Sequence, residues 1–252
     1  MKASTAYSYR LLIERRIIPA IGDIAISDIT TEMLEQYVDG LGLVSPKNYW
    51  RIIKPTFDLA VRRGWVQHNP CDDIYHKRVS KAPVEVFEIE EVKKLISIAS
   101  PQWRKDVIEI AFRTGMRPGE IFALKWDSIN FLKKRIIVKT NCCYAPEQGI
   151  VIGSPKTPAS IRCIDLDDCS VEILQRIFRT SCSDFVFGKD DGGPRFSSTL
   201  GMAKLCDKAN IRRRKLKHMR STHISLLIEE HVDLPEIQSR IGHASPATLL
   251  RY

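Results

Sequence analysis

The sequence of 252 residues contains no apolar run of the roughly 18 or more residues that a membrane-spanning helix needs. It also lacks an apolar signal segment after Met1-Lys2-Ala3-Ser4, so nothing marks the chain for export. We therefore expect a cytoplasmic protein without a membrane partner. Internal repeats and low-complexity tracts are missing too, and 44% hydrophobic with 27% charged residues argues against a disordered or collagen-like chain.

The seven cysteines are odd in number and include no Cys-x-x-Cys pair. Neither a disulfide framework nor a zinc site is therefore indicated, and we expect reduced, mostly packed thiols. No carboxylate cluster or Cys/His set has the spacing of metal ligands either. We expect a protein that needs no metal and no other cofactor.

Acidic residues are the scarcer charged type, since 30 Asp and Glu stand against 39 Lys and Arg, a formal net charge of +9. This excess suits a polyanionic partner such as nucleic acid without proving one. The densest basic segment, residues 211–220, is on composition alone either a solvated face or loop, or a ligand-binding stretch. A partly buried helical pattern follows from Ser221 to Ile228, so some of these cations begin a core helix. A charge is rarely placed there unless it meets a partner or a ligand.

The chain divides into a helical part, residues 1–70, a linker, residues 71–84, and a second part, residues 85–252. In the first part Thr30 is the expected N-cap of one helix, and Ser45-Pro46 begins the next, which Pro55 should kink. The linker is polar, has mixed charge and contains few large apolar residues.

The second part opens with helical periodicity and then changes to short runs rich in β-branched residues, separated by Gly, Pro and Asn. These runs, which predict a small antiparallel sheet, are residues 135–139, 149–152 and 161–164. Helical periodicity returns around residues 171–178 and 200–209, and again from His218 to the end. We expect a mainly α (α+β) fold, with a helical N-terminal domain and a mixed helical domain that carries the small sheet.

The segment from Thr114 to Glu120 places Arg117 at a turn between two helices. Pro118 occupies the first position of the new helix, and Glu120 lies in its first turn. An arginine beside a helix N-terminus is well placed to hold a phosphate through its bidentate fork. The alternative is that Arg117 merely pairs with Glu120 or caps carbonyl groups.

The segment Thr114–Glu120 and three others, in their order along the chain, resemble the tyrosine recombinase (phage integrase) family. The resemblance covers nearly the whole chain. The turn at Thr114–Glu120 resembles the family's first arginine box, and Lys217-His218-Met219-Arg220 resembles its His-x-x-Arg box, with Lys217 in the histidine position. Gly242-His243, followed nine positions later by Tyr252, is similar to the family's third histidine and nucleophilic tyrosine. Pro155-Lys156-Thr157 corresponds to the lysine of its β-hairpin.

The resemblance implies a site-specific recombinase that cleaves and rejoins double-stranded DNA through a 3′-phosphotyrosyl intermediate. Tyr252 would be the nucleophile, and Lys156 the general acid. The phosphate would be held by Arg117, Arg220 and His243. Lys217 would help to activate the phenol or bind phosphate, with His218 one position later as the alternative.

The resemblance also implies that residues 1–70 are a core-binding domain and residues 85–252 the catalytic domain, which close round DNA as a C-shaped clamp. Four protomers would act on two duplexes, and the participation of accessory DNA-bending or directionality proteins stays open. Two rival functions also stay open. One is a type IB topoisomerase-like relaxase, and the other is a DNA-binding module that is inactive or truncated, because related proteins continue beyond the position of Tyr252.

Overall fold

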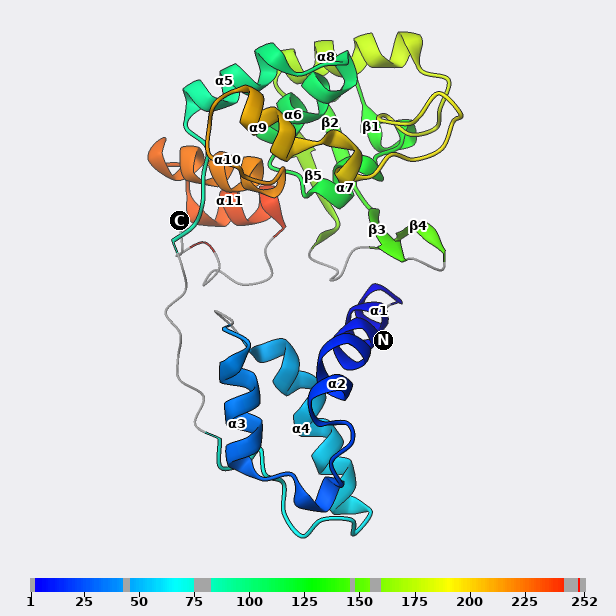
Figure 1. Cartoon of the computed structure of the whole chain (residues 1–252). Coiled ribbons are helices and arrows are strands. Elements are labelled where there is room, and N and C mark those ends of the chain that lie inside the picture. Colours follow the sequence, from blue (N-terminus) through cyan, green and yellow to red (C-terminus); the bar gives the residue numbers. More distant parts are fainter. Residues whose placement is uncertain are drawn as a thin grey trace. The chain divides into compact units, whose positions relative to one another are not determined.

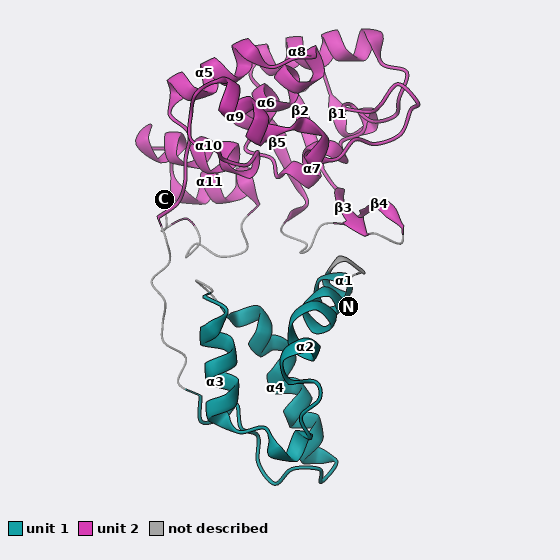
Figure 2. Cartoon of the chain, in the orientation of Figure 1, with its two compact units in different colours: residues 1–82 teal, residues 83–252 magenta. Residues whose placement is uncertain are grey.

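The computed structural model describes residues 3–42, 46–74, 83–145, 148–154 and 160–242, together with Leu249 (Figure 1). The chain forms two compact units, Met1–Ala82 and Pro83–Tyr252 (Figure 2). The fold is mainly helical with small antiparallel sheets, which confirms the expected fold class. None of the helices in the described ranges has the length and hydrophobicity that crossing a bilayer requires.

Unit 1 is built from helices around one small apolar core. In chain order these are α1 (Ala3–Leu12), a π-helical turn (Ile13–Ile17), α2 (Ile18–Ile21), a 3-10 turn (Ile26–Asp28), α3 (Thr31–Gly40) and α4 (Lys47–Arg62). Thr30 caps α3 as predicted, because its hydroxyl accepts a hydrogen bond from the backbone N–H of Met33 at 3.3 Å. Leu34 and Val38 then face the core, where they meet buried residues of α4 such as Phe57.

Helix α4 begins one residue later than expected, with Pro46 in the N-cap position, while Ser45 lies outside the described residues. The helix continues through Pro55 to Arg62, so the proline does not end it. The kink at Pro55 stays a prediction.

The first residues of the expected linker pack inside unit 1. Cys71 is 3% exposed and Ile74 is 9% exposed, and both belong to the apolar core formed by α3 and α4. Hydrogen bonds of Asn69 hold this segment against α4, because Asn69 donates to Asp58 at 2.7 Å and accepts from the Cys71 N–H at 2.9 Å. The described part of unit 1 therefore reaches Ile74, and residues 75–82 lie outside the described ranges.

Unit 2 surrounds a larger core with helices and two sheets. Its helices are α5 (Ile89–Ile98), α6 (Gln102–Thr114), α7 (Pro118–Phe122), α8 (Asp168–Thr180), α9 (Met202–Lys208), α10 (Lys217–Glu229) and α11 (Leu234–Ile241), with 3-10 turns at Trp126–Ser128 and Ser197–Leu200. A separate apolar cluster joins α10 and α11, which lie side by side (Figure 1), through Ile224, Ile237, Ile241 and Leu249. This cluster fixes α11 against α10.

The expected antiparallel strands are present and are divided between two small sheets. One has the antiparallel order β1 (Ile129–Asn130), β2 (Arg135–Val138), β5 (Arg162–Asp165), and the other is a hairpin of β3 (Asn141–Ala145) and β4 (Gly149–Gly153). The sequence pattern missed β1, which has two residues, and β3, which has no β-branched residue. Both strands form because β2 and β4 pair with them.

The cysteines are free but less packed than expected. Cys71, Cys142 and Cys206 are buried, Cys143 is half-buried, and Cys163, Cys169 and Cys182 are exposed. The expectation of mostly packed thiols was therefore wrong for these last three. Burial raises the pKa of the Cys71 and Cys142 thiols to about 11, so both stay protonated at neutral pH.

Candidate functional site

The turn between α6 and α7 packs tightly against α10. Gly115 ends α6 in the left-handed conformation, with φ at +63°, and its N–H donates to the Ala111 carbonyl at 3.1 Å. A Cβ atom at Gly115 would lie 2.6 Å from Cδ2 of His223 on α10. Glycine is therefore required here both for the backbone conformation and for the close approach of α10.

Arg117 follows this turn and is held by Glu120. One oxygen of Glu120 accepts the Arg117 backbone N–H at 2.8 Å, and the other accepts Nη1 of the Arg117 guanidinium at 2.7 Å. Glu120 is 2% exposed, whereas the Arg117 side chain is 37% exposed. Arg117 therefore does pair with Glu120, as the alternative interpretation expected. A guanidinium has five N–H donors, however, and the Arg117 guanidinium still reaches solvent. The pair orients Arg117 without covering it.

Glu120 is shared with a second arginine, Arg162 of β5. The Arg162 fork donates to both carboxylate oxygens, from Nη2 at 2.9 Å and from Nη1 at 3.1 Å. Burial acts to raise the pKa of Glu120, but the hydrogen bonds and charge of Arg162, followed by those of Arg117, outweigh burial and hold the pKa below its ordinary value. Glu120 is therefore ionised and accepts from both arginines.

Arg220 approaches the same region from α10. Its side chain is buried, with 7% exposure. Nη1 donates to the Gly115 carbonyl at 2.8 Å, and Nη2 donates to the Ile241 carbonyl at 2.6 Å. Arg220 thereby connects the α6–α7 turn, which carries Arg117, to the end of α11.

Three consecutive carbonyls at the end of α11 each accept from a different arginine. Arg162 Nε donates to the Arg240 carbonyl at 2.8 Å, Arg220 to that of Ile241, and Arg117 Nη2 to that of Gly242 at 3.3 Å. The last carbonyls of a helix lack intrahelical donors and carry partial negative charge, so arginines stabilise this end. Since consecutive Cα atoms are about 3.8 Å apart, the guanidiniums of Arg117 and Arg220 reach neighbouring points on the chain.

The Arg240 side chain fastens α11 to three other elements. Nε donates to Nε2 of His223 on α10 at 3.1 Å, Nη1 to the Asp165 carbonyl on β5 at 3.1 Å, and Nη2 to the Arg113 carbonyl on α6 at 3.2 Å. Burial, followed by the charge of Arg240, lowers the pKa of His223 to about 4. His223 is therefore neutral at pH 7 and can accept this hydrogen bond.

Lys217 and His218, the two alternatives in the second box, have different surroundings. Lys217 is exposed at the first position of α10, one turn before Arg220. The His218 ring is turned elsewhere, since Nδ1 accepts from the Lys215 N–H at 3.2 Å and Nε2 lies 3.5 Å from Glu85. Burial, followed by the charge of Lys217, lowers the pKa of His218. Of the two, Lys217 is the more exposed, because only 12% of the His218 side chain reaches solvent.

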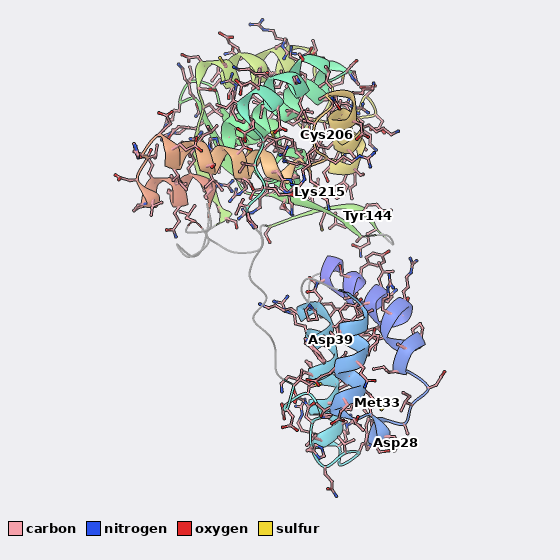
Figure 3. All side chains as sticks on the ribbon, turned by 60° about the vertical axis from the view of Figure 1, so that its left-hand side comes forward. Asp28, Met33, Asp39, Tyr144, Cys206 and Lys215 are labelled. Carbon is pink, nitrogen blue, oxygen red and sulfur yellow. The ribbon has the colours of Figure 1, made fainter. Side chains whose placement is uncertain are left out.

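Much of the basic segment at residues 211–220 is balanced by acidic neighbours. Ion pairs join Arg212 to Glu85 at 2.9 Å, Arg213 to Asp207 at 2.6 Å and Arg214 to Glu91 at 2.9 Å. Lys215, labelled in Figure 3, and Lys217 have no acidic group within 4 Å among the residues that the structure describes. Each of these three arginines therefore has an acidic partner, although the side chains of Arg212 and Arg213 remain 72% and 71% exposed.

The structure thus brings together Arg117 and Arg220, with Lys217 one helical turn from Arg220. The other three predicted site residues, Lys156, His243 and Tyr252, lie outside the described ranges. Within those ranges no group of three or more His, Cys, Asp or Glu side chains could hold a metal ion. Sequence reasoning missed Arg162 and Arg240. The signal for Arg162 was its position two residues before Ile164, on the buried face of β5.

Known proteins share this architecture. A family model described as the phage integrase family matches residues 85–252, and a model of the phage integrase N-terminal SAM-like domain matches residues 1–42. The ICEBs1 integrase of Bacillus subtilis (strain 168) is 28% identical over 241 residues, which cover 89% of this chain and 64% of that protein. The chain thus spans less than two thirds of the length of that relative.

Two solved structures show the same fold at low sequence identity. The Tn1549 transposon integrase in complex with a circular intermediate DNA matches with a TM-score of 0.87 at 20% identity, covering 100% of this chain and 89% of that one. A lambda integrase tetramer bound to a Holliday junction matches with a TM-score of 0.70 at 20% identity, covering 99% of this chain and 72% of that one. With the family model matched across the unit that holds Arg117 and Arg220, the chain belongs to the phage integrase (tyrosine recombinase) family.

Proposed function

We propose that this chain is a site-specific recombinase that cleaves and rejoins double-stranded DNA through a 3′-phosphotyrosyl intermediate. The observation that carries the proposal is the convergence of Arg117 and Arg220 on the consecutive carbonyls of Ile241 and Gly242, directly before His243 in the sequence. Two guanidiniums held on neighbouring carbonyls would both donate to a single bound phosphate.

In the proposed reaction the Tyr252 oxygen attacks phosphorus, forms the 3′-phosphotyrosyl bond and displaces a 5′-hydroxyl. The energy of the phosphodiester is kept in the new bond, so the step needs no nucleotide cofactor. Negative charge grows on the non-bridging oxygens in the transition state, where Arg117, Arg220 and His243 would donate hydrogen bonds. Both arginines are already fixed by protein acceptors, so little reorganisation is needed when the phosphate arrives.

Two lysines have the remaining roles. An alkoxide leaves poorly from phosphorus, and we assign Lys156 as the general acid that protonates it. Lys217 is the residue of the second box that we assign to the phosphate or to activation of the Tyr252 phenol. Its exposure beside Arg220 supports this choice over His218, both of whose ring nitrogens face groups of the protein.

We further propose that residues 1–70 are the core-binding domain and residues 85–252 the catalytic domain, in line with the two matched family models. By analogy with the lambda integrase tetramer, four protomers would act on two duplexes, with affinity supplied mainly by lysine and arginine contacts to phosphates. Because the relatives include a protein of a bacterium, whose DNA lies in the cytoplasm, we assign the chain to that compartment.

Two other functions use the same site. A type IB topoisomerase-like relaxase would form the same adduct but religate the same strand, and an inactive DNA-binding module would form none. The integrase names of the relatives favour the recombinase. Strand exchange between two sites, measured beside relaxation of a supercoiled plasmid, separates the recombinase from the relaxase.

The decisive experiment uses nicked suicide duplexes made from the sequences that flank the coding gene. We expect a covalent protein–DNA adduct on a denaturing gel, and we expect Tyr252→Phe to abolish it. If the chain binds DNA in a salt-sensitive manner but forms no adduct on any duplex, the recombinase proposal is wrong and the DNA-binding module replaces it.

A further inference from the structure

Arg162 occupies the centre of the contacts that hold the candidate phosphate site, yet it lies too deep to touch DNA. Its side chain is 4% exposed on β5. All of its nitrogens donate to protein groups, which are both oxygens of Glu120 and the carbonyls of Ser160 and Arg240. Any effect of Arg162 on a DNA phosphate must therefore pass through the groups that it holds.

One path from Arg162 leads to Arg117 through Glu120. Each carboxylate oxygen of Glu120 accepts one hydrogen bond from Arg117 and one from Arg162. The planar Arg162 fork therefore sets the plane of the carboxylate, and the carboxylate sets the direction of the Arg117 guanidinium. Without the fork, Glu120 would keep only its two bonds to Arg117 and would be free to rotate with it.

The other path leads to the end of α11. Arg162 Nε donates to the Arg240 carbonyl, the first of the three consecutive carbonyls, and the next two accept from Arg220 and Arg117. The contact ties the end of α11 to β5 beside the bond from Arg240 Nη1 to the Asp165 carbonyl. Arg162 thus fixes both acceptors of Arg117, the Glu120 carboxylate and the segment that contains Gly242.

A pair elsewhere in unit 2 shows what an ordinary structural contact of this type looks like. Asp106 of α6, with a side chain 4% exposed, accepts from Arg176 of α8 at 2.7 Å and from Gln102 at 2.8 Å. None of these three residues contacts a candidate site residue in a described hydrogen bond or ion pair. The pair serves as a control, because it joins a buried acid to an arginine and no described hydrogen bond or ion pair connects either residue to Arg117.

We propose that Arg162 is a positioning residue of the phosphate site, which orients Arg117 through Glu120 and holds the end of α11 on which Arg117 and Arg220 converge. The proposal rests on the proposed function, since it concerns the rate of the DNA cleavage step. It predicts an effect on that rate rather than on DNA affinity.

The test compares Arg162→Gln, Arg162→Lys and the control Arg176→Gln in the full chain. The rate constant and the end point of adduct formation are measured on the suicide duplex in single turnover, below the unfolding temperature of each variant. DNA affinity is measured by fluorescence anisotropy. We expect both Arg162 variants to lower the rate constant on the order of tenfold or more, with end point and affinity near those of the wild type. Arg176→Gln should keep the wild-type rate constant.

The lysine variant keeps the charge and loses the fork, so it tests positioning even if Arg162→Gln folds poorly. A structural role alone would lower the folded fraction, and hence the end point, without slowing the molecules that react. Wild-type rate constants in folded Arg162→Lys and Arg162→Gln would overturn the proposal. It would also be overturned if the fold-decrease in rate constant of the double variant Arg162→Gln/Arg117→Ala equalled the product of the fold-decreases of the two single variants. Absence of any wild-type adduct would instead overturn the proposed function, and this proposal with it.

Discussion

Replacing Gly115 by alanine should damage unit 2 more than the same change at another left-handed glycine. Gly115 and Gly201 have nearly the same backbone conformation, with φ at +63° and +67°. A Cβ atom at Gly201 would meet nothing within 4 Å, whereas at Gly115 it would lie 2.6 Å from Cδ2 and 3.2 Å from Cγ of His223. The two substitutions therefore share the backbone cost and differ in the packing cost.

The magnitudes separate the two variants clearly. Alanine in the left-handed region costs roughly 1–2 kcal/mol, which is the whole loss expected for Gly201→Ala. At Gly115 the ring of His223 is buried and bonded to Arg240, so it cannot turn aside without losing that bond. Overpacking of this kind adds about 1–3 kcal/mol, so Gly115→Ala should lose about 2–5 kcal/mol in all.

The assay is urea unfolding of the full chain, followed by far-UV circular dichroism, for the wild type and both variants. The rate constant of adduct formation provides a second readout, because the Gly115 carbonyl accepts from Arg220 and the Gly201 carbonyl does not. We expect Gly115→Ala to lose more stability and to slow the reaction, while Gly201→Ala keeps the wild-type rate constant. Equal losses of stability in the two variants would refute the packing argument.

Three further predictions address the site. Arg117→Ala or Arg220→Ala should slow adduct formation by about 10²-fold or more while DNA binding in a filter assay falls far less; equal losses would contradict a role in the transition state. Lys156→Ala should slow cleavage of a normal phosphodiester much more than cleavage of a 5′-bridging phosphorothiolate, whose leaving group needs no proton, and equal slowing would remove Lys156 as the acid. Folding lowers the pKa of His223 from 6.5 to about 4, so the unfolded chain binds more protons between these values and stability should fall as the pH falls from 6.5 to about 4. His223→Gln should remove up to about 3 kcal/mol of that pH dependence in urea titrations, and an unchanged slope would show that another group causes it.

Local sequence signals predicted the elements whose ends are set by neighbouring residues. The Thr30 cap of α3 and the start of α7 at Pro118 follow from one or two side chains, and both are present. The division of the strands into two sheets could not be predicted in this way. Strand β3 forms because β4 pairs with it, and β5 pairs with β2 across the intervening hairpin.

The contacts of the candidate site depend on residues far apart in the chain. The pair of Arg162 with Glu120 spans 42 positions, and the bond from Arg117 to Gly242 spans 125. The motifs identified Arg117 and Arg220 but not the groups that hold them. Likewise, the basic run at residues 211–220 could not be recognised as balanced, because one acidic partner, Glu91, is 123 positions away from Arg214.

The end of α11 explains how several arginines can be held together and still attract a phosphate. The carbonyls around Ile241 accept hydrogen bonds from Arg117, Arg162 and Arg220, and Arg240 belongs to the same segment. Like charges so close to one another repel. A carboxylate beside each arginine would relieve the repulsion but would also cancel the charge that a phosphate is to meet. Helix-end carbonyls carry only partial charge, so they orient a guanidinium and leave its positive charge intact. The full negative charge of Glu120 is shared between the buried Arg162 and Arg117, because Glu120 forms an ion pair with each. The Arg117 guanidinium therefore keeps part of its positive charge uncompensated, and its side chain is exposed at the site.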